Sequence, residues 1–157
     1  MTRRSSTPSR SDSENAEFAF DPCDAVTTPA VTDLVDTGGS TGSQGSALQR
    51  HYAADTCSAL GATTDGIEVD VTLLAVAFDD VDAARADIID NSNGEVTANL
   101  DGLPEGSLAT TGGFWGDAVW VLDTDAPFAV AVTLTGTDPV VGDLALAVKI
   151  AIAFLAQ

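Results

Sequence analysis

Asp36 is the residue of this chain that most invites a catalytic interpretation. It lies in residues 34–38, Leu-Val-Asp-Thr-Gly, the pattern found in aspartic proteases, where two such aspartates share a proton to activate water. The chain has one copy, so a homodimer would have to supply the pair. Thr28 and Pro29 are typical of a helix start, and the apolar residues after them predict a helix that ends with Asp36. The protease motif follows a strand instead, so we predict that Asp36 is structural.

His51 is the only histidine. A Ser-His-Asp hydrolase would have to combine it with a serine such as Ser46 or Ser58, and the chain contains no Gly-x-Ser-x-Gly elbow. We therefore expect His51 to be a loop or surface residue, and we predict no catalytic residue.

Residues 90–95 (Asp-Asn-Ser-Asn-Gly-Glu) look like part of a calcium loop. Placing Gly94 at the sixth position of such a loop puts Ile89 at the first, where a carboxylate is needed. The register fails, so we predict a polar turn here, no metal site and no cofactor.

Cys23 and Cys57 are the two cysteines of the chain. No CxxC pair or histidine cluster accompanies them, so their pattern does not indicate a metal site. Two cysteines in a chain of this size are either reduced core residues in the cytosol or one disulfide outside it. Their spacing leaves both alternatives open.

Three aromatic residues, Phe114, Trp115 and Trp120, gather in the second half of the chain. They could line a cleft for a small apolar ligand or form part of the core, and aromatic residues at strand positions are core more often than not. They are the candidate ligand-binding residues.

The strands that would position these residues are predicted from hydrophobic periodicity. Residues 67–73 alternate between apolar and polar, which indicates a half-buried strand. The phase then slips over residues 74–78, which a bulge or a strand end buried on both faces would explain. Further strands are expected at residues 96–100, 107–111, 119–123 and 128–135, the last two forming an antiparallel hairpin.

A second helix is predicted to start at Asp79 or Asp80 and a last one at Asp138, while residues 40–46 are expected to form a mobile loop. Residues 144–156 are apolar except for Lys149. This run is shorter than the roughly 20 residues that cross a bilayer, so we predict a buried C-terminal helix and no transmembrane span.

The domain organisation follows from composition. Residues 1–17 are rich in Ser, Thr, Pro and Arg and lack apolar periodicity, so we expect a disordered, tether-like tail. No apolar stretch of signal-peptide length follows Arg3 and Arg4, so no signal peptide is predicted in the chain as given. Residues 18–157 are predicted to form a single α+β domain, an antiparallel sheet with helices packed against it.

The charge excludes some partners. With 24 acidic and 6 basic residues, the net charge is −18. A field of that sign repels phosphate backbones and anionic lipid headgroups, so nucleic acid is excluded as a partner. The aspartate-rich composition fits both adaptation to high salt and a GC-rich genome.

Several motifs follow one another in a distinctive order: residues 20–26 (Phe-Asp-Pro-Cys-Asp-Ala-Val), a second cysteine, residues 116–120 (Gly-Asp-Ala-Val-Trp), a hairpin and an Ala/Leu-rich closing helix. This order resembles that of actinobacterial secreted lipoproteins of unknown function. Two features depart from that family: no lipid-attachment cysteine precedes the tail, and Ser58 rather than an aromatic residue follows Cys57. The resemblance implies export to the cell envelope, a Cys23–Cys57 disulfide, a lipid anchor outside this chain and no enzyme activity.

The expected function is that of a non-enzymatic, exported cell-envelope module that binds a small apolar ligand or a protein partner. One alternative is a hydrolase that acts through Asp36. Another is a cytosolic acidic protein of a salt-adapted cell, with Cys23 and Cys57 reduced.

Overall fold

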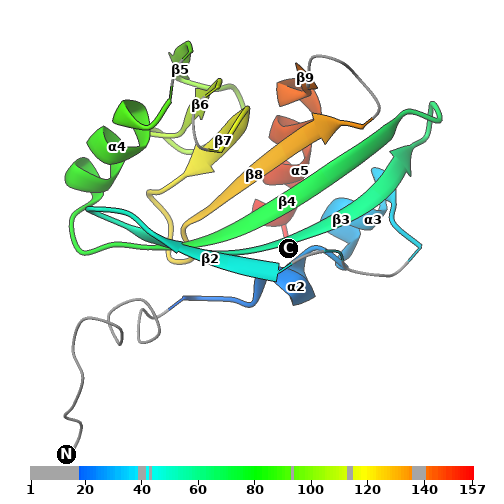
Figure 1. Cartoon of the computed structure of the whole chain (residues 1–157), viewed down its shortest axis with the longest axis horizontal. Helices are drawn as coiled ribbons and strands as arrows, with labels where there is room; N and C mark the ends of the chain where they lie inside the picture. The colour runs from blue at the N-terminus through cyan, green and yellow to red at the C-terminus, as the bar shows by residue number, and fades with distance from the viewer. Residues whose placement is uncertain (1–17, 39–41, 43, 93, 113–114, 136–140) are drawn as a thin grey trace, which may run out of the picture.

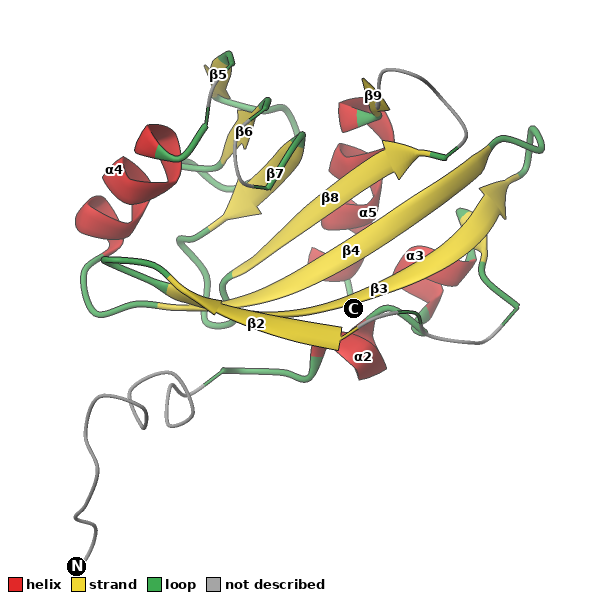
Figure 2. Ribbon diagram, in the orientation of Figure 1, coloured by secondary structure: helices red, strands yellow, loops and turns green. Residues whose placement is uncertain are grey.

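A computed structural model describes residues 18–38, 42, 44–92, 94–112, 115–135 and 141–157. These residues form one curved antiparallel sheet with helices packed against it (Figures 1 and 2), which confirms the predicted α+β class. The strand order is β1-β3-β4-β8-β7-β6-β5, with β2 beside β3 and β9 beside β8. The predicted tail, residues 1–17, lies outside the described residues.

The elements have the following bounds. The strands are β1 Val35–Asp36, β2 Gln44–Leu48, β3 Ala53–Thr63, β4 Glu68–Ala77, β5 Val96–Ala98, β6 Leu108–Thr110, β7 Ala118–Val121, β8 Phe128–Leu134 and β9 Val141–Gly142. The helices are α2 Pro22–Ala25, α3 Pro29–Thr32, α4 Val81–Asp90 and α5 Leu144–Leu155.

Strand β4 is the centre of the sheet, between β3 and β8. Its pairing with both neighbours runs without interruption, so the phase slip in its sequence is not a bulge. Residues 73–76 are all buried, because helices cover both faces of the sheet at this end of the strand. This confirms one of the two explanations offered by the sequence. The predicted β7–β8 hairpin is also present.

Helices α2, α3 and α5 cover one face of the sheet and enclose the first core cluster. The side chain of Asp143 caps α5 by accepting a hydrogen bond from the Leu146 amide at 3.0 Å. One face of α5 is buried against the sheet, which confirms the predicted buried C-terminal helix. Each leucine or isoleucine side chain that is fully buried on this face contributes about 1.5–3 kcal/mol to stability. The residues that α5 buries are Leu146, Ala147, Ile150 and Ala151.

Helix α4 packs on the opposite face, over one end of the sheet only (Figure 1). The carboxylate of Asp80 caps it by accepting from the Asp82 amide at 2.9 Å, as expected from the sequence. Ala84 and Ile88 point into the second core cluster. Arg85 forms an ion pair with Asp123 in the β7–β8 loop at 3.4 Å.

The helix predicted to start at Pro29 and end with Asp36 is wrong beyond its first turn. Helix α3 stops at Thr32, and Val35–Asp36 form β1 instead. The Val35 side chain is fully buried beside Thr63 of β3, so the tertiary pairing overrides the local helical pattern. A Cβ at Gly61 would come within 2.5 Å of the Asp36 carbonyl oxygen, so the close approach of β1 to β3 requires glycine there.

Two other differences concern the sheet edge and the last helix. Residues 44–48 form β2 instead of part of a mobile loop, and the long strand β3 has no counterpart in the sequence prediction. Helix α5 begins at Leu144, after the short strand β9. The predicted start at Asp138 lies outside the described residues. Among the described helices, none has the length and apolar character needed to cross a membrane.

Candidate functional site

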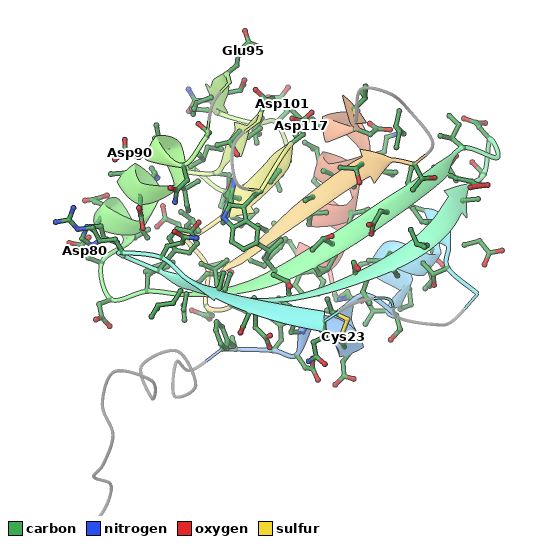
Figure 3. The ribbon with its side chains drawn as sticks, in the orientation of Figure 1. Cys23, Asp80, Asp90, Glu95, Asp101 and Asp117 are labelled. Carbon is green, nitrogen blue, oxygen red and sulfur yellow. A yellow bond between two sulfur atoms is a disulfide. The ribbon has the colours of Figure 1, made fainter. Side chains whose placement is uncertain are left out.

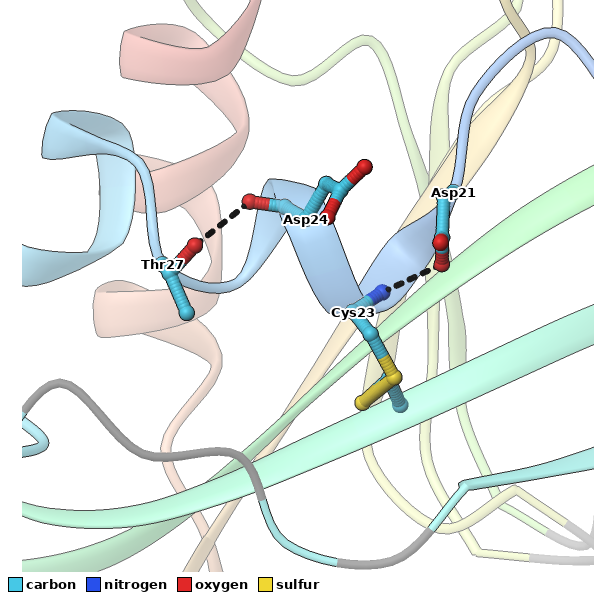
Figure 4. The surroundings of a disulfide bond; sticks show 5 residues. Asp21, Cys23, Asp24 and Thr27 are labelled. Carbon is cyan, nitrogen blue, oxygen red and sulfur yellow. Dashed lines mark hydrogen bonds between the residues drawn. A yellow bond between two sulfur atoms is a disulfide. The ribbon is translucent and has the colours of Figure 1, made fainter.

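Cys23 and Cys57 form a disulfide between α2 and the middle of β3 (Figure 4), with a Cα–Cα distance of 5.0 Å. The Asp21 carboxylate starts α2 by accepting from the Cys23 amide at 2.9 Å, which orients the cysteine toward the sheet. The bridge joins residues separated by 34 positions. It therefore ties the first helix of the fold to its central sheet.

Two of the three candidate ligand-binding aromatics, Trp115 and Trp120, belong to the second core cluster or pack against it. Trp120 is fully buried, and its indole N–H donates to the Thr110 hydroxyl at 3.0 Å. The half-buried Trp115 donates to the Tyr52 hydroxyl at 2.6 Å, and both Trp115 and Tyr52 contact Trp120 edge-on. Burial raises the pKa of Tyr52 above its usual range. Of the two roles predicted for these aromatics, a ligand cleft or the core, Trp120 has the role of a core residue. Phe114 lies outside the described residues.

The Gly-Asp-Ala segment of residues 116–118 has a structural role beside this cluster. Gly116 has a φ of +72°, a conformation that favours glycine. The Asp117 carboxylate accepts from the Gly112 amide at 3.2 Å and closes the loop that carries Trp115. This motif positions the aromatic cluster.

Among the described residues, no helix lies over the other half of the same sheet face, which we call the open face. Helix α4 and the Trp115 side chain pack over the far end, whereas no described helix lies over β3, β4 and β8 here (Figure 1). Residues paired across strands point to the same side, so the registers of these three strands place the side chains of the open face together. They are Thr56, Ser58, Leu60, Asp70, Thr72 and Thr133.

Asp70 is the charged residue at the centre of the open face, between Leu60 on β3 and Thr133 on β8. Its side chain is half-buried, and its Oδ1 atom is buried without a hydrogen-bond partner among the residues that the structure describes. Desolvation by burial raises the pKa of Asp70 above its usual range. A hydrogen-bond donor that reaches a carboxylate in this state stabilises it, and a cationic donor stabilises it most.

A hollow of about 470 Å³ continues the open face toward the sheet edge. Leu60 lines this hollow with an apolar side chain that is 64% exposed. Asp36 and Glu68 supply carboxylates to the same hollow, which therefore combines apolar and acidic character. Its lining residues are Asp36, Leu60, Gly61, Ala62, Glu68, Val69 and Thr135.

Asp36 lies in a strand and not at a helix end, so the positional argument for its structural role was wrong. Its side chain is exposed, and its Oδ1 accepts from the Gly38 amide at 3.0 Å. This local hydrogen bond stabilises the turn after β1, whereas the sequence had placed Asp36 at the end of a helix. Hydrolysis through Asp36 stays an untested alternative.

His51 lies where the sequence predicted, in the exposed loop of the β2–β3 hairpin. Its backbone N–H donates to the Asp87 carboxylate of α4 at 2.9 Å. The loop is therefore attached to α4 through the backbone of His51.

Asp90 is the last residue of α4, and the described residues 91, 92, 94 and 95 after it lie in neither a helix nor a strand. Asp90 and Glu95 lie on the outside of the molecule (Figure 3). In the described part of the chain, no three His, Cys, Asp or Glu side chains come together in a way that could hold a metal ion.

Of the open-face residues, Ser58 was named from the sequence, as a serine that could act with His51, and the others were not. Asp70 and Thr72 alternate with the buried Val69 and Val71, so their position on a second face could be inferred. Their neighbours could not, because β3 was not predicted and the cross-strand register was unknown.

Comparisons of this chain with protein-family models, with curated proteins and with solved structures find no match.

Proposed function

We propose that this chain is a non-catalytic module of the cell envelope that binds a partner protein through its open face. The observation that carries the proposal is the Asp70 carboxylate at the centre of the open face. It is partly desolvated, and its buried Oδ1 atom has no hydrogen-bond partner in the described part of the chain. Such a group lowers the stability of the free protein. A hydrogen bond from a partner's donor would therefore contribute favourably to the free energy of binding.

The chemistry of the face defines the partner. Leu60 offers an exposed apolar contact, and Asp36, Glu68 and Asp70 offer negative charge. The partner surface would present an arginine or lysine to Asp70, surrounded by apolar and hydroxyl-bearing side chains. The net charge of −18 would attract a basic partner to the molecule as a whole.

The proposed location has two supports. The Cys23–Cys57 disulfide is consistent with an oxidising compartment. The resemblance to secreted lipoproteins points to the same place. A small apolar ligand at the aromatic cluster has weaker support, because Trp120 is fully enclosed by its neighbours.

Site-specific photo-cross-linking in living cells tests the proposal. A photoreactive amino acid replaces Leu60 on the open face or, as a matched control, the exposed Val96 on β5. We expect position 60 to form a cross-linked product with a distinct protein and position 96 to form none. The change Asp70→Lys, made together with the probe at position 60, should abolish the product, because it places a cation opposite the partner's cation.

Protease added to intact cells tests the location in the same strains. The exported module should be digested without cell lysis. Protection of the chain until lysis would refute the envelope location. Equal cross-linking from positions 60 and 96, or a product that survives Asp70→Lys, would refute the open face as the binding surface.

A further inference from the structure

Strand β2 forms an exposed edge of the sheet (Figure 1). It pairs with β3 along one side, and no other strand of the described residues pairs with its outer side. Most of its side chains are exposed: Gln44, Gly45, Ser46 and Leu48. The backbone groups on its outer side are therefore available for pairing.

The hairpin geometry identifies those groups. The Gln49 amide donates to the Tyr52 carbonyl at 2.8 Å, so Gln49 and Tyr52 form a hydrogen-bonded pair. Such pairs alternate with non-hydrogen-bonded pairs along an antiparallel ladder. Within β2, Gly45 and Ala47 consequently bond to β3, whereas the N–H and C=O groups of Gln44, Ser46 and Leu48 point outward.

The edge lacks the devices that prevent pairing with another chain. Natural edge strands are protected by charged side chains, prolines, bulges or very short length. Residues 44–48, Gln-Gly-Ser-Ala-Leu, contain no charge and no proline. The other edge strands of the described sheet are shorter: β1 and β9 have two residues each and β5 has three, compared with five in β2.

The outward groups of β2 match those of a second copy of the same strand. In an antiparallel pair centred on Ser46, each Ser46 faces the partner's Ser46 and each Gln44 faces the partner's Leu48. These are the residues with outward backbone groups, so every outward N–H and C=O of the strand is satisfied. The arrangement is isologous and closes with two copies.

We propose that two copies of this chain pair through β2 to form a continuous sheet across a two-fold axis. The axis is perpendicular to the sheet, so both open faces lie on the same side and α2 of each copy lies on the other. The interface contains about five residues from each copy, compared with roughly 20 to 30 in a standard interface. The dimer is therefore weak and depends on concentration.

Sedimentation velocity of the full chain over a concentration series tests the pairing. Salt of about 0.3 M reduces the repulsion between two copies of charge −18. We expect dimer at high concentration. The change Ser46→Lys places two lysines opposite each other at the axis and should raise the dissociation constant by at least about tenfold. Thr97→Lys makes the same change of charge on β5 and should leave the dimer intact.

Amide hydrogen exchange provides a readout that does not depend on any variant. The Gln44, Ser46 and Leu48 amides should become protected as the concentration rises, while those of Gly45 and Ala47 should be protected throughout. A monomer at every concentration up to about 1 mM would overturn the proposal. A dimer that Ser46→Lys leaves unchanged, or that protects the β5 amides instead, would also overturn it.

Discussion

The chemistry of individual residues centres on Asp70. Its carboxylate is partly desolvated, and its Oδ1 atom has no partner in the described part of the protein. Polar residues that lower stability in this way are retained at binding surfaces, because stability and function make opposite demands there. Asp55 shows a related effect: its pKa is raised first by burial and then by the negative charge of Asp21.

The change Asp70→Asn should stabilise the protein at neutral pH. Because burial raises the pKa of Asp70, the folded state still holds a proton, at pH values between the unfolded and the folded pKa, that the unfolded state has already released. The free energy of unfolding therefore falls as the pH rises from the unfolded pKa through the raised folded pKa, and the loss persists above both. An asparagine side chain at this position cannot ionise, so we expect a gain on the order of 1 kcal/mol at pH 7.

Urea unfolding at pH 7 and pH 3 provides the measurement. The gain should disappear at pH 3, below the usual pKa, where Asp70 is protonated in both states. Asp65→Asn, in the exposed β3–β4 turn, is the matched control and should change little. Destabilisation at pH 7 would show that the Asp70 carboxylate has a stabilising partner.

The elements are arranged around three long strands, β3, β4 and β8. The disulfide fastens α2 to β3, and α5 packs across β7 and β8 on the same face. Aromatic contacts join these layers, since Phe154 of α5 lies 4.8 Å from Phe128 and 5.1 Å from Phe20, measured between ring centroids. The N-terminal segment of the described chain is therefore held by both the bridge and the C-terminal helix.

Removal of the disulfide should have a large effect on stability. Replacing both cysteines by alanine is expected to lower the free energy of unfolding by about 3–4 kcal/mol, because the unfolded chain regains the entropy of a loop of about 35 residues. Cys57 is fully buried, so its replacement also leaves a small cavity.

Urea unfolding of the double variant and of the reduced parent checks this expectation. The two should show similar losses. An unfolding midpoint that neither reduction nor substitution changes would mean that α2 is held without the bridge.

The whole molecule carries a dense negative charge on its surface. Helix α4 begins after Asp80 and ends with Asp90, and Figure 3 also shows Glu95, Asp101 and Asp117 on this half of the fold. Arg85 is paired with Asp82 and Asp123. Repulsion among the excess carboxylates opposes the compact state.

Salt should therefore stabilise the protein. Raising NaCl from about 0.05 M to 0.5 M shortens the screening length from above 10 Å to about 4 Å. We expect the melting temperature at pH 7 to rise by several degrees. Calorimetry near the sequence pI of about 4.1 is the control, because repulsion is small there and the rise should vanish. A melting temperature at pH 7 that falls with salt would show that attractive pairs outweigh the repulsion.

The sequence by itself determined the elements whose hydrophobic pattern or helix cap agrees with the packing around them. The periodicity of residues 67–73, the Asp80 cap and the apolar run of α5 each predicted an observed element, because burial on the expected face reinforces the pattern. The α+β class followed from the order of these elements.

Tertiary structure decided the sheet edge, the residues beside Asp36 and the open face. Strand β3 is rich in alanine, and its residues form a strand because β4 on one side and β1 and β2 on the other satisfy its backbone. The pairing of Val35 with Thr63 ended α3 early and turned Asp36 into a strand residue. Cross-strand register alone brought Leu60, Asp70 and Thr133 together, and residues this far apart in sequence leave no local signal of their contact.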